Sequence, residues 1–362
     1  MLPISANLIP IGEKQLAIGN ADTPVPSFGE DLSLFARCKE AMYAVVTHCP
    51  TEGKRALLPA YTCETVIQPF RQEGWEFAFY PYDVNLRFNG EAFRALLKSF
   101  RPNLVVAQML YGVDFNDAEL ELLREAKKAG CFVLADLTQG LFSDLRADCI
   151  DAYVSSIRKW LPLPDGGFLR WQGHAGLDEG LEPDELFHGH LLCAAEAFRV
   201  YLETGDSAML RCSKLLEHDG KAPVIALHAM SDFSKRIYAS CAPKEGAAQR
   251  MENARYLWEH LQDCKSCKPI YKSIDDMTTA PLWFPVYVPD KKEFLVKVGR
   301  PYRFSAPGLW PVETPEVLVD DLTRWQYSHI VAVTCSQNFT TADMQRIVEA
   351  FRSWDAELTI PF

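Results

Sequence analysis

The sequence lacks the features that would place the protein at a membrane or on a nucleic acid. No stretch approaches the roughly 20 apolar residues of a membrane-spanning helix, and the first residues have neither the basic start nor the apolar core of a secretory signal. There is no long basic run, and 37 Lys and Arg stand against 48 Asp and Glu, a net charge of −11. We therefore expect a cytoplasmic protein with no membrane partner and no nucleic-acid partner.

Several signatures of catalysis and of metal binding are also missing. There is no Walker loop, no G-x-S-x-G and no G-x-G-x-x-G, which argues against an NTPase, a serine hydrolase or a dinucleotide dehydrogenase. Eleven cysteines without a framework spacing indicate free thiols in a reducing compartment. Cys264 and Cys267 form a C-x-x-C pair, but no second pair completes a zinc site, and His188 and His190 would diverge on a helix. We predict no metal site.

What is present is the alternation of an α/β protein. The 362 residues are 48% apolar and 23% charged, which fits a globular protein of about two domains. The pattern predicts helices at 34–48, 62–74, 90–100 and 117–130, and strands at 55–60, 76–83, 103–110 and 131–136. The last three strands are nearly continuous apolar runs, which is typical of a parallel sheet covered on both faces. We predict a doubly wound α/β domain.

The rest of the chain predicts a second, smaller α/β unit. Residues 175–240 read as mostly helical, and a long amphipathic helix is expected at 245–264. Strand and helix then alternate at 281–289, 290–298, 329–335 and 340–354. We place the domain boundary so that residues 1–240 form the large domain and 241–362 the small one.

A carboxylate and a lysine follow two of the apolar runs. Asp136 comes directly after 133–135, and Lys159 comes shortly after the β-forming residues 150–157. An unpaired charge at the mouth of a buried sheet is costly, so Asp136 needs a cationic partner. A simple ion pair with Lys159 is one interpretation.

The other interpretation is a cofactor that needs both groups. Pyridoxal phosphate (PLP) requires a lysine for a Schiff base and an acid to keep its ring nitrogen protonated. Its phosphate is usually bound by backbone amides and hydroxyls at a helix N-terminus. Ser155 and Ser156 supply hydroxyls on the strand end just before Lys159.

The order of these segments resembles the DegT/DnrJ/StrS sugar-aminotransferase family of fold-type-I PLP enzymes. The central match is "LADLTQG" followed by "YVSSIRKWLPLPDGGFL". "KEAMYAVV" is similar to the family's first helix, "ALLPAYTCETVIQPF" to its cofactor-facing loop, "AQMLYG" to the strand before the aspartate, "RMENARYLWEHL" to its joining helix and "SQNFTTADMQRIVEAF" to its closing strand and helix. The resemblance implies a mostly parallel sheet in a three-layer α/β/α large domain, a smaller C-terminal α/β domain, and a homodimer with active sites at the subunit interface.

The resemblance also implies a role for each matching residue. Lys159 would bond covalently to PLP and then move the proton between substrate and cofactor carbons, and Asp136 would pair with the ring nitrogen. Gln139 would contact the ring oxygen or the phosphate, and one of Ser155 and Ser156 would bind the phosphate. Four further residues are expected at the cofactor: Cys38 and Lys39 at the phosphate-binding helix start, and Tyr61 and Thr62 in the cofactor-facing loop.

Two positions depart from the family pattern. Cys38 stands where a glycine is expected, and Cys63 stands where an aromatic residue would stack on the ring. Tyr61 or Tyr111 could replace that aromatic residue. Arg303, which lies near Trp310 in the small domain, could hold the carboxylate of an amino donor, although a plain surface arginine is the preferred interpretation.

The implied activity is transfer of an amino group from an amino acid such as glutamate to a keto-sugar or nucleotide-sugar acceptor. Lys159 argues against the family's sugar dehydratases, which carry histidine at this position. A PLP-dependent lyase and an amino-acid aminotransferase remain open. A protein of a different class, which binds PLP or a sugar for regulation without catalysis, is the further alternative.

Overall fold

The computed structural model describes residues 2–3, 9–25, 28, 31–174, 176–219, 224–242, 244–304 and 310–362. The chain groups into two compact units, each built from two stretches of sequence. Unit 1 comprises Met1–Cys49 and Ala152–Glu245, and unit 2 comprises Pro50–Asp151 and Gly246–Phe362. The division into domains 1–240 and 241–362 stays a prediction. Every helix in the described part of the chain is too short or too polar to cross a bilayer.

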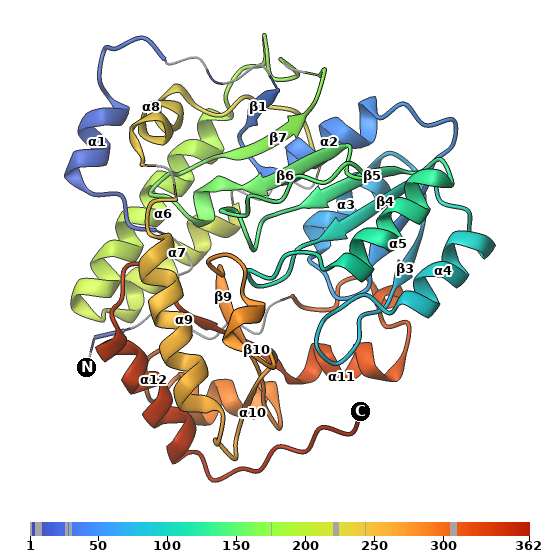
Figure 1. Cartoon of the computed structure of the whole chain (residues 1–362). Coiled ribbons are helices and arrows are strands. Elements are labelled where there is room, and N and C mark those ends of the chain that lie inside the picture. Colours follow the sequence, from blue (N-terminus) through green and yellow to red (C-terminus); the bar gives the residue numbers. More distant parts are fainter. Residues whose placement is uncertain are drawn as a thin grey trace. The chain divides into compact units, whose positions relative to one another are not determined.

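Unit 1 is built around three antiparallel strands in the order β1-β7-β6. These strands are β1 (Leu32–Phe35), β6 (Ala152–Ser156) and β7 (Gly167–Trp171). Helix α2 (Cys38–His48) packs against all three of them. The other helices pack in pairs, α6 (Glu185–Thr204) with α7 (Ser207–Asp219) and α1 (Glu13–Gly19) with α8 (Asp232–Ser240) (Figure 1).

The predicted helix 34–48 is wrong at its beginning. Leu34 and Phe35 belong to β1, where they pair with Phe168 and Gly167 of β7. The helix begins only at Cys38, after the extended residue Arg37. A strand partner more than 130 positions away decides this boundary, because the spacing of apolar residues over 34–48 is compatible with a helix throughout.

Unit 2 contains four parallel strands in the order β5-β4-β2-β3. They are β2 (Arg55–Pro59), β3 (Glu76–Tyr80), β4 (Leu104–Gln108) and β5 (Phe132–Asp136), and the four strands predicted from the sequence are confirmed. Helices α3 (Glu64–Gln72) and α4 (Gly90–Ser99) pack on β3, and α5 (Asp117–Lys128) packs on β5 beside α4 (Figure 1). The capping box between Asn116 and Glu119 fixes the start of α5.

The C-terminal part of unit 2 carries a second sheet of three antiparallel strands, in the order β10-β9-β8. Its strands are β8 (Lys268–Pro269), β9 (Trp283–Tyr287) and β10 (Ile330–Thr334). The expected long helix is present as α9 (Ala247–Leu261), and α12 (Thr341–Ser353) packs against it. The remaining helices are α10 (Lys291–Phe294), which continues into a π-helical turn at Leu295–Gly299, and α11 (Asp321–His329).

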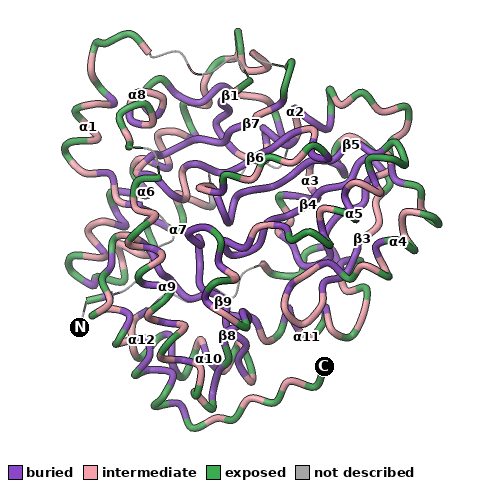
Figure 2. The backbone as a smooth tube through the Cα atoms, in the orientation of Figure 1, coloured by how far each residue is buried: buried purple, intermediate pink, exposed green. Residues whose placement is uncertain are grey.

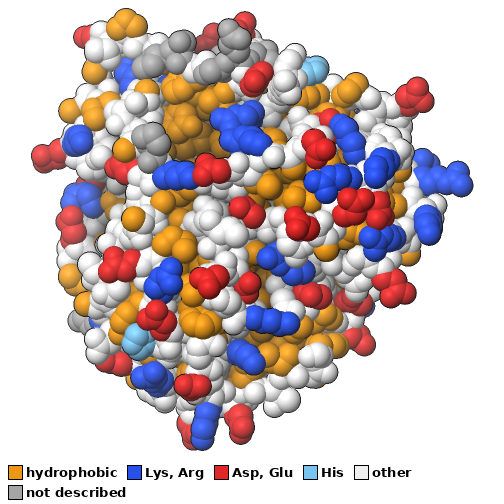
Figure 3. All heavy atoms as spheres, in the orientation of Figure 1, with side chains coloured by type: hydrophobic (Ala, Val, Ile, Leu, Met, Phe, Trp, Pro, Cys, Tyr) orange, Lys and Arg blue, Asp and Glu red, His pale blue; other side chains and the backbone are white. Residues whose placement is uncertain are grey.

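Several strands of the described chain are buried along their whole length. Every residue of β4, β5, β6, β9 and β10 is buried (Figure 2). The prediction of strands covered on both faces is confirmed for β4 and β5 but is wrong for β3, whose first three residues are exposed or half-buried because the strand lies at the edge of the sheet. On the face shown in Figure 3, cationic and anionic side chains are intermixed and neither sign forms a broad field.

Candidate functional site

In unit 1, Lys159 lies in a turn that the returning strand holds in place. The turn is the 3₁₀ helix Ile157–Lys159, directly after β6. The backbone N–H groups of Ile157 and Arg158 both donate to the Gly166 carbonyl, at 3.0 and 3.3 Å. Gly166 has a φ of +144°, which side-chain-bearing residues rarely adopt. The chain folds straight back after Lys159 because β7 must pair with β6, and this pairing leaves a half-buried lysine at the strand end.

The first turn of α2 lies directly over Gly167, the first residue of β7. A Cβ atom at Gly167 would stand 2.3 Å from the Cys38 nitrogen and 2.4 Å from the Arg37 carbonyl carbon. Gly167 is opposite Ser156 in the antiparallel pair, and opposite residues point to the same face of a sheet. Ser156 therefore faces the side on which α2 begins. Since successive residues alternate, Ser155 faces the other side.

The two serines differ in their surroundings as well. The Ser155 hydroxyl is fully buried and has no hydrogen-bond partner in the described part of the chain. A buried hydroxyl without a partner costs about 1–3 kcal/mol. Of the two, only Ser156 shares a face with the N-terminus of α2, where helix geometry favours an anion.

Charged residues surround the start of α2. Arg37 forms ion pairs with Glu40 and Asp184, the latter at 2.5 Å, and its guanidinium lies 3.7 Å from the centre of the Phe187 ring. Arg158 faces Glu217 at 3.8 Å, and burial lowers the pKa of its guanidinium, with Arg37 acting in the same direction. Lys39 is half-buried in the first turn of the helix. The region is thus cationic but largely compensated by carboxylates.

In unit 2, the acid predicted to serve the cofactor is the last residue of β5. Asp136 is 3% exposed, and its Oδ1 accepts from the Thr138 backbone N–H at 2.8 Å. Gln139 is equally buried, and its Oε1 accepts from the Tyr111 N–H at 3.1 Å. Asp136 and Gln139 therefore lie at one strand end with polar atoms fixed by backbone contacts.

Tyr61 and Thr62 lie after β2 in the same unit and are held by Tyr327 of α11. The Thr62 N–H donates to the Tyr327 hydroxyl at 3.1 Å, and the Thr62 hydroxyl donates to Gln108 at 2.8 Å. The Tyr61 hydroxyl is 3.2 Å from that of Tyr111, and burial raises the pKa of Tyr61. The Tyr61 ring contacts Trp310, with 4.9 Å between ring centres. Both tyrosines offered as stacking residues are thus buried, and which ring stacks on the cofactor stays a prediction.

The remaining candidates occupy other positions in the two units. Cys63 is the residue that precedes α3, and Arg303 has a φ of +55° just before the undescribed residues 305–309. His188 contacts Asp165 of unit 1, whereas the His190 Nδ1 has no partner among the described residues. No group of three or more potential metal ligands gathers in the part of the chain that the structure describes.

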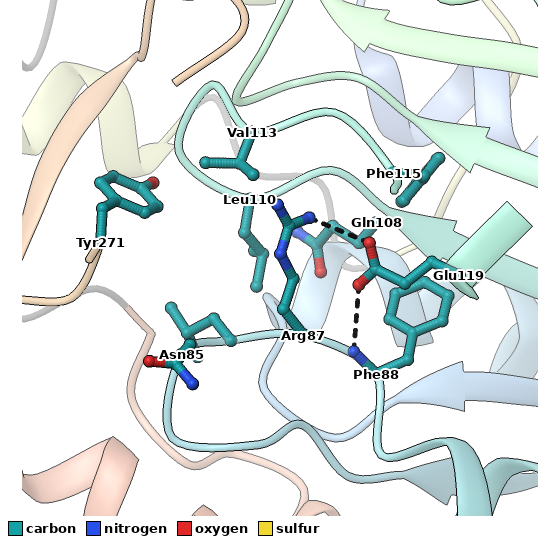
Figure 4. A pocket seen from close by; sticks show the side chains of 10 residues that line it. Asn85, Arg87, Phe88, Gln108, Leu110, Val113, Phe115, Glu119 and Tyr271 are labelled. Atoms are coloured by element: carbon teal, nitrogen blue, oxygen red, sulfur yellow. Dashed lines mark hydrogen bonds and ion pairs between the residues drawn. The ribbon is translucent and has the colours of Figure 1, made fainter. Parts of the chain in front are cut away.

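Sequence reasoning missed Gln108, which pairs in register with Asp136 and ends β4. The rule that ligands bind at the carboxyl ends of parallel strands could have found it. Gln108 also lines a small pocket in unit 2 with Arg87, Leu110 and Tyr271 (Figure 4). In the same pocket, Arg87 pairs with Glu119 at 2.9 Å, while burial raises the pKa of Glu119. Because Gln108 also accepts from the Thr62 hydroxyl, it connects the lining of this pocket to the loop after β2.

No model of a known protein family matches the sequence, and no curated protein matches it. Solved structures, in contrast, match the fold of this chain. The sugar aminotransferase CalS13 from Micromonospora echinospora is 13% identical, with a TM-score of 0.68 over 98% of this chain and 100% of that one. A DegT DnrJ EryC1 StrS aminotransferase from Brucella abortus is 14% identical, with a TM-score of 0.60 over 89% and 85%.

A third structure is PseC from Helicobacter pylori, an aminotransferase involved in the biosynthesis of pseudoaminic acid. It is 14% identical, with a TM-score of 0.61 over 95% of this chain and 92% of that one. The matches extend over nearly the whole chain, in agreement with the order of motifs that first suggested the family. The protein therefore has the fold of the DegT/DnrJ/EryC1/StrS sugar aminotransferases, as its sequence motifs predict.

Proposed function

We propose that the protein is a PLP-dependent aminotransferase that transfers an amino group from an amino acid such as glutamate to a keto-sugar or nucleotide-sugar. The observation that carries the proposal is in unit 1, where a turn fixed by two backbone hydrogen bonds presents Lys159. In the same unit, Ser156 shares a face with the start of α2. The fold supports the proposal, and a structural neighbour, DesI, was solved with its TDP-sugar product. We also infer a cytoplasmic homodimer.

The residues fit the chemical needs of PLP. The phosphate needs amides at a helix start and a hydroxyl, which α2 and Ser156 supply. The ring nitrogen needs a carboxylate, and Asp136 is a buried one held by the Thr138 amide. The ring oxygen needs a donor, and the side-chain amide of Gln139, whose Oε1 is held by the Tyr111 N–H, can supply one. Bound PLP would supply an electron sink that stabilises negative charge at the substrate carbon.

The protein's own groups perform the remaining steps. The Lys159 amine would take the proton from the α-carbon of the donor and return it at the cofactor carbon, so the proton is conserved. Asp136 would keep the ring nitrogen protonated throughout, because an anionic carboxylate favours the charged form of its partner. The donor would take up one water and leave as a keto acid, its amino group would stay with the bound cofactor, and the acceptor carbonyl would then receive that group and release one water. Positioning these groups is the protein's main contribution to rate.

The test is absorbance between about 300 and 500 nm for the purified protein with added PLP. The wild type is expected to show a band near about 410–420 nm that borohydride removes. Peptide mass spectrometry should then find the reduced cofactor on Lys159. Lys159→Ala should abolish this attachment, whereas Lys214→Ala, an exposed lysine of α7, should leave it intact. Asp136→Asn should keep the attachment but lose most of the donor reaction, because the amide carries no charge.

The donor reaction separates catalysis from mere binding. Glutamate or another amino donor should shift the band and release a keto acid, and a keto-sugar should restore it. A band that no donor shifts would favour the non-catalytic alternative, which the cysteines at positions 38 and 63 motivate. A protein that stays colourless with PLP would overturn the proposal and leave Asp136 and Lys159 with structural roles.

A further inference from the structure

Asp165 is a buried carboxylate that no step of the proposed reaction uses. It is 1% exposed, and four donors converge on it. Its Oδ2 accepts from the Ser231 N–H at 2.7 Å, and its Oδ1 accepts from the Ser231 hydroxyl at 2.6 Å, from the Ser234 hydroxyl and from His188 Nδ1 at 3.1 Å. A buried carboxylate is costly unless it is fully hydrogen-bonded, so this cluster fixes Asp165 in one place.

The donors come from two helices of unit 1. Ser231 caps the N-terminus of α8, and its hydroxyl also accepts from the Ser234 N–H at 3.2 Å. His188 lies in the first turns of α6. Asp165 is therefore tied both to the start of α8 and to α6, and a substitution that removes the carboxylate releases both ties.

The set of aspartate, histidine and serine is not a hydrolytic triad. In a triad the serine hydroxyl bonds to the histidine, which takes its proton. Here both hydroxyls bond to the aspartate, and Ser231 and Ser234 are 5% and 0% exposed, which leaves neither accessible to a substrate. The arrangement holds a backbone in position and offers no nucleophile.

The backbone that it holds is the one that fixes the Lys159 turn. Asp165 is bonded to Gly166, whose carbonyl accepts from the Ile157 and Arg158 N–H groups and whose own N–H donates to the Ala36 carbonyl at 2.9 Å. Without its carboxylate, residue 165 would no longer be held by these hydrogen bonds. The neighbouring Gly166 carbonyl, which accepts from both N–H groups of the turn, would then be held less firmly. We propose that Asp165 is a positioning residue that, through Gly166, sets the place of the Lys159 amine. This inference rests on the proposed function for its consequence in catalysis.

The first test uses the full chain without cofactor and measures backbone hydrogen exchange by mass spectrometry. Asp165→Asn should speed exchange of the Ile157 and Arg158 amides by about tenfold, because charge-assisted hydrogen bonds that stabilise the turn are lost. Asp232→Asn is the matched control, since Asp232 is an exposed residue in the first turn of the same α8. Ser234→Ala removes a single donor and should give a smaller change of the same kind if Asp165→Asn fails to fold.

The second test measures kcat and KM for the donor with the PLP-loaded enzyme. Asp165→Asn should lower kcat about tenfold and leave KM unchanged, since a displaced lysine slows proton transfer without touching donor contacts. Unchanged exchange, exchange that rises equally in all peptides, or local exchange without a fall in kcat would each overturn the proposal. Failure of the proposed function would show separately, as a wild type that binds no PLP, and the exchange result would still decide whether Asp165 holds the turn.

Discussion

Gly167 provides the sharpest test of how the start of α2 is positioned. A Cβ atom there would stand 2.3 Å from the Cys38 nitrogen and 2.4 Å from the Arg37 carbonyl carbon, both backbone atoms that no side-chain rotation can move. Carbon atoms in contact are normally about 3.5 Å apart, so Gly167→Ala must shift the helix or the strand by about 1 Å. Overpacking of this kind costs about 1–3 kcal/mol of unfolding free energy.

The assay is urea denaturation followed by circular dichroism, with PLP binding as a second readout. At about 3 kcal/mol per M of urea, a loss of about 2 kcal/mol lowers the midpoint by roughly 0.7 M. PLP affinity should fall as well, because the amides at the start of α2 move with the helix. The matched control is Gly189→Ala in α6, where a Cβ meets no atom within 4 Å and alanine should stabilise the helix by about 0.5–1 kcal/mol. A midpoint for Gly167→Ala at or above that of the wild type would refute the close approach.

Two further predictions concern unit 2. Tyr327→Phe removes the hydroxyl that accepts from the Thr62 N–H and lies 3.0 Å from the Ala60 carbonyl, so the unfolding free energy should fall by about 1–3 kcal/mol; an unchanged urea midpoint would contradict this. The hydrogen bond from Cys267 lowers the pKa of Cys264 to about 5, so Cys264 should be a thiolate at both pH 6 and pH 8. Its rate of reaction with iodoacetamide should therefore be nearly the same at the two pH values. Cys267→Ala should slow the reaction at pH 6, and a wild-type rate that rises steeply with pH would count against the pairing.

The four parallel strands of unit 2 could be predicted because each contains an apolar run bounded by turn residues. The start of α2 could not, because Leu34 and Phe35 fit a helix by spacing and are drawn into β1 by β7. The spacing of apolar residues within 34–48 does not depend on a strand partner that lies more than 130 positions away in the chain.

The candidate residues divide in the same way. Asp136 and Lys159 could be identified from the sequence because a charged residue at the end of a buried strand destabilises the fold unless it is paired. Asp165 could not be identified from the sequence. Its hydrogen-bond donors lie in α6 and α8, and no pattern around "LPLPDGG" indicates them. The sequence alone does not distinguish Ser155 from Ser156. The pairing of Gly167 with Ser156 shows which of the two faces α2.

The interleaving of the two units has a consequence for synthesis on the ribosome. All of unit 1 has been made once Glu245 is added, whereas unit 2 is missing everything from Gly246 onward. Thr62, Tyr111 and Gln139 then still lack Tyr327, Tyr271 and Leu282, the residues that contact them in the finished unit. The candidate residues of unit 1 can therefore take up their positions during translation, whereas those of unit 2 must wait until the C-terminal helices and strands emerge.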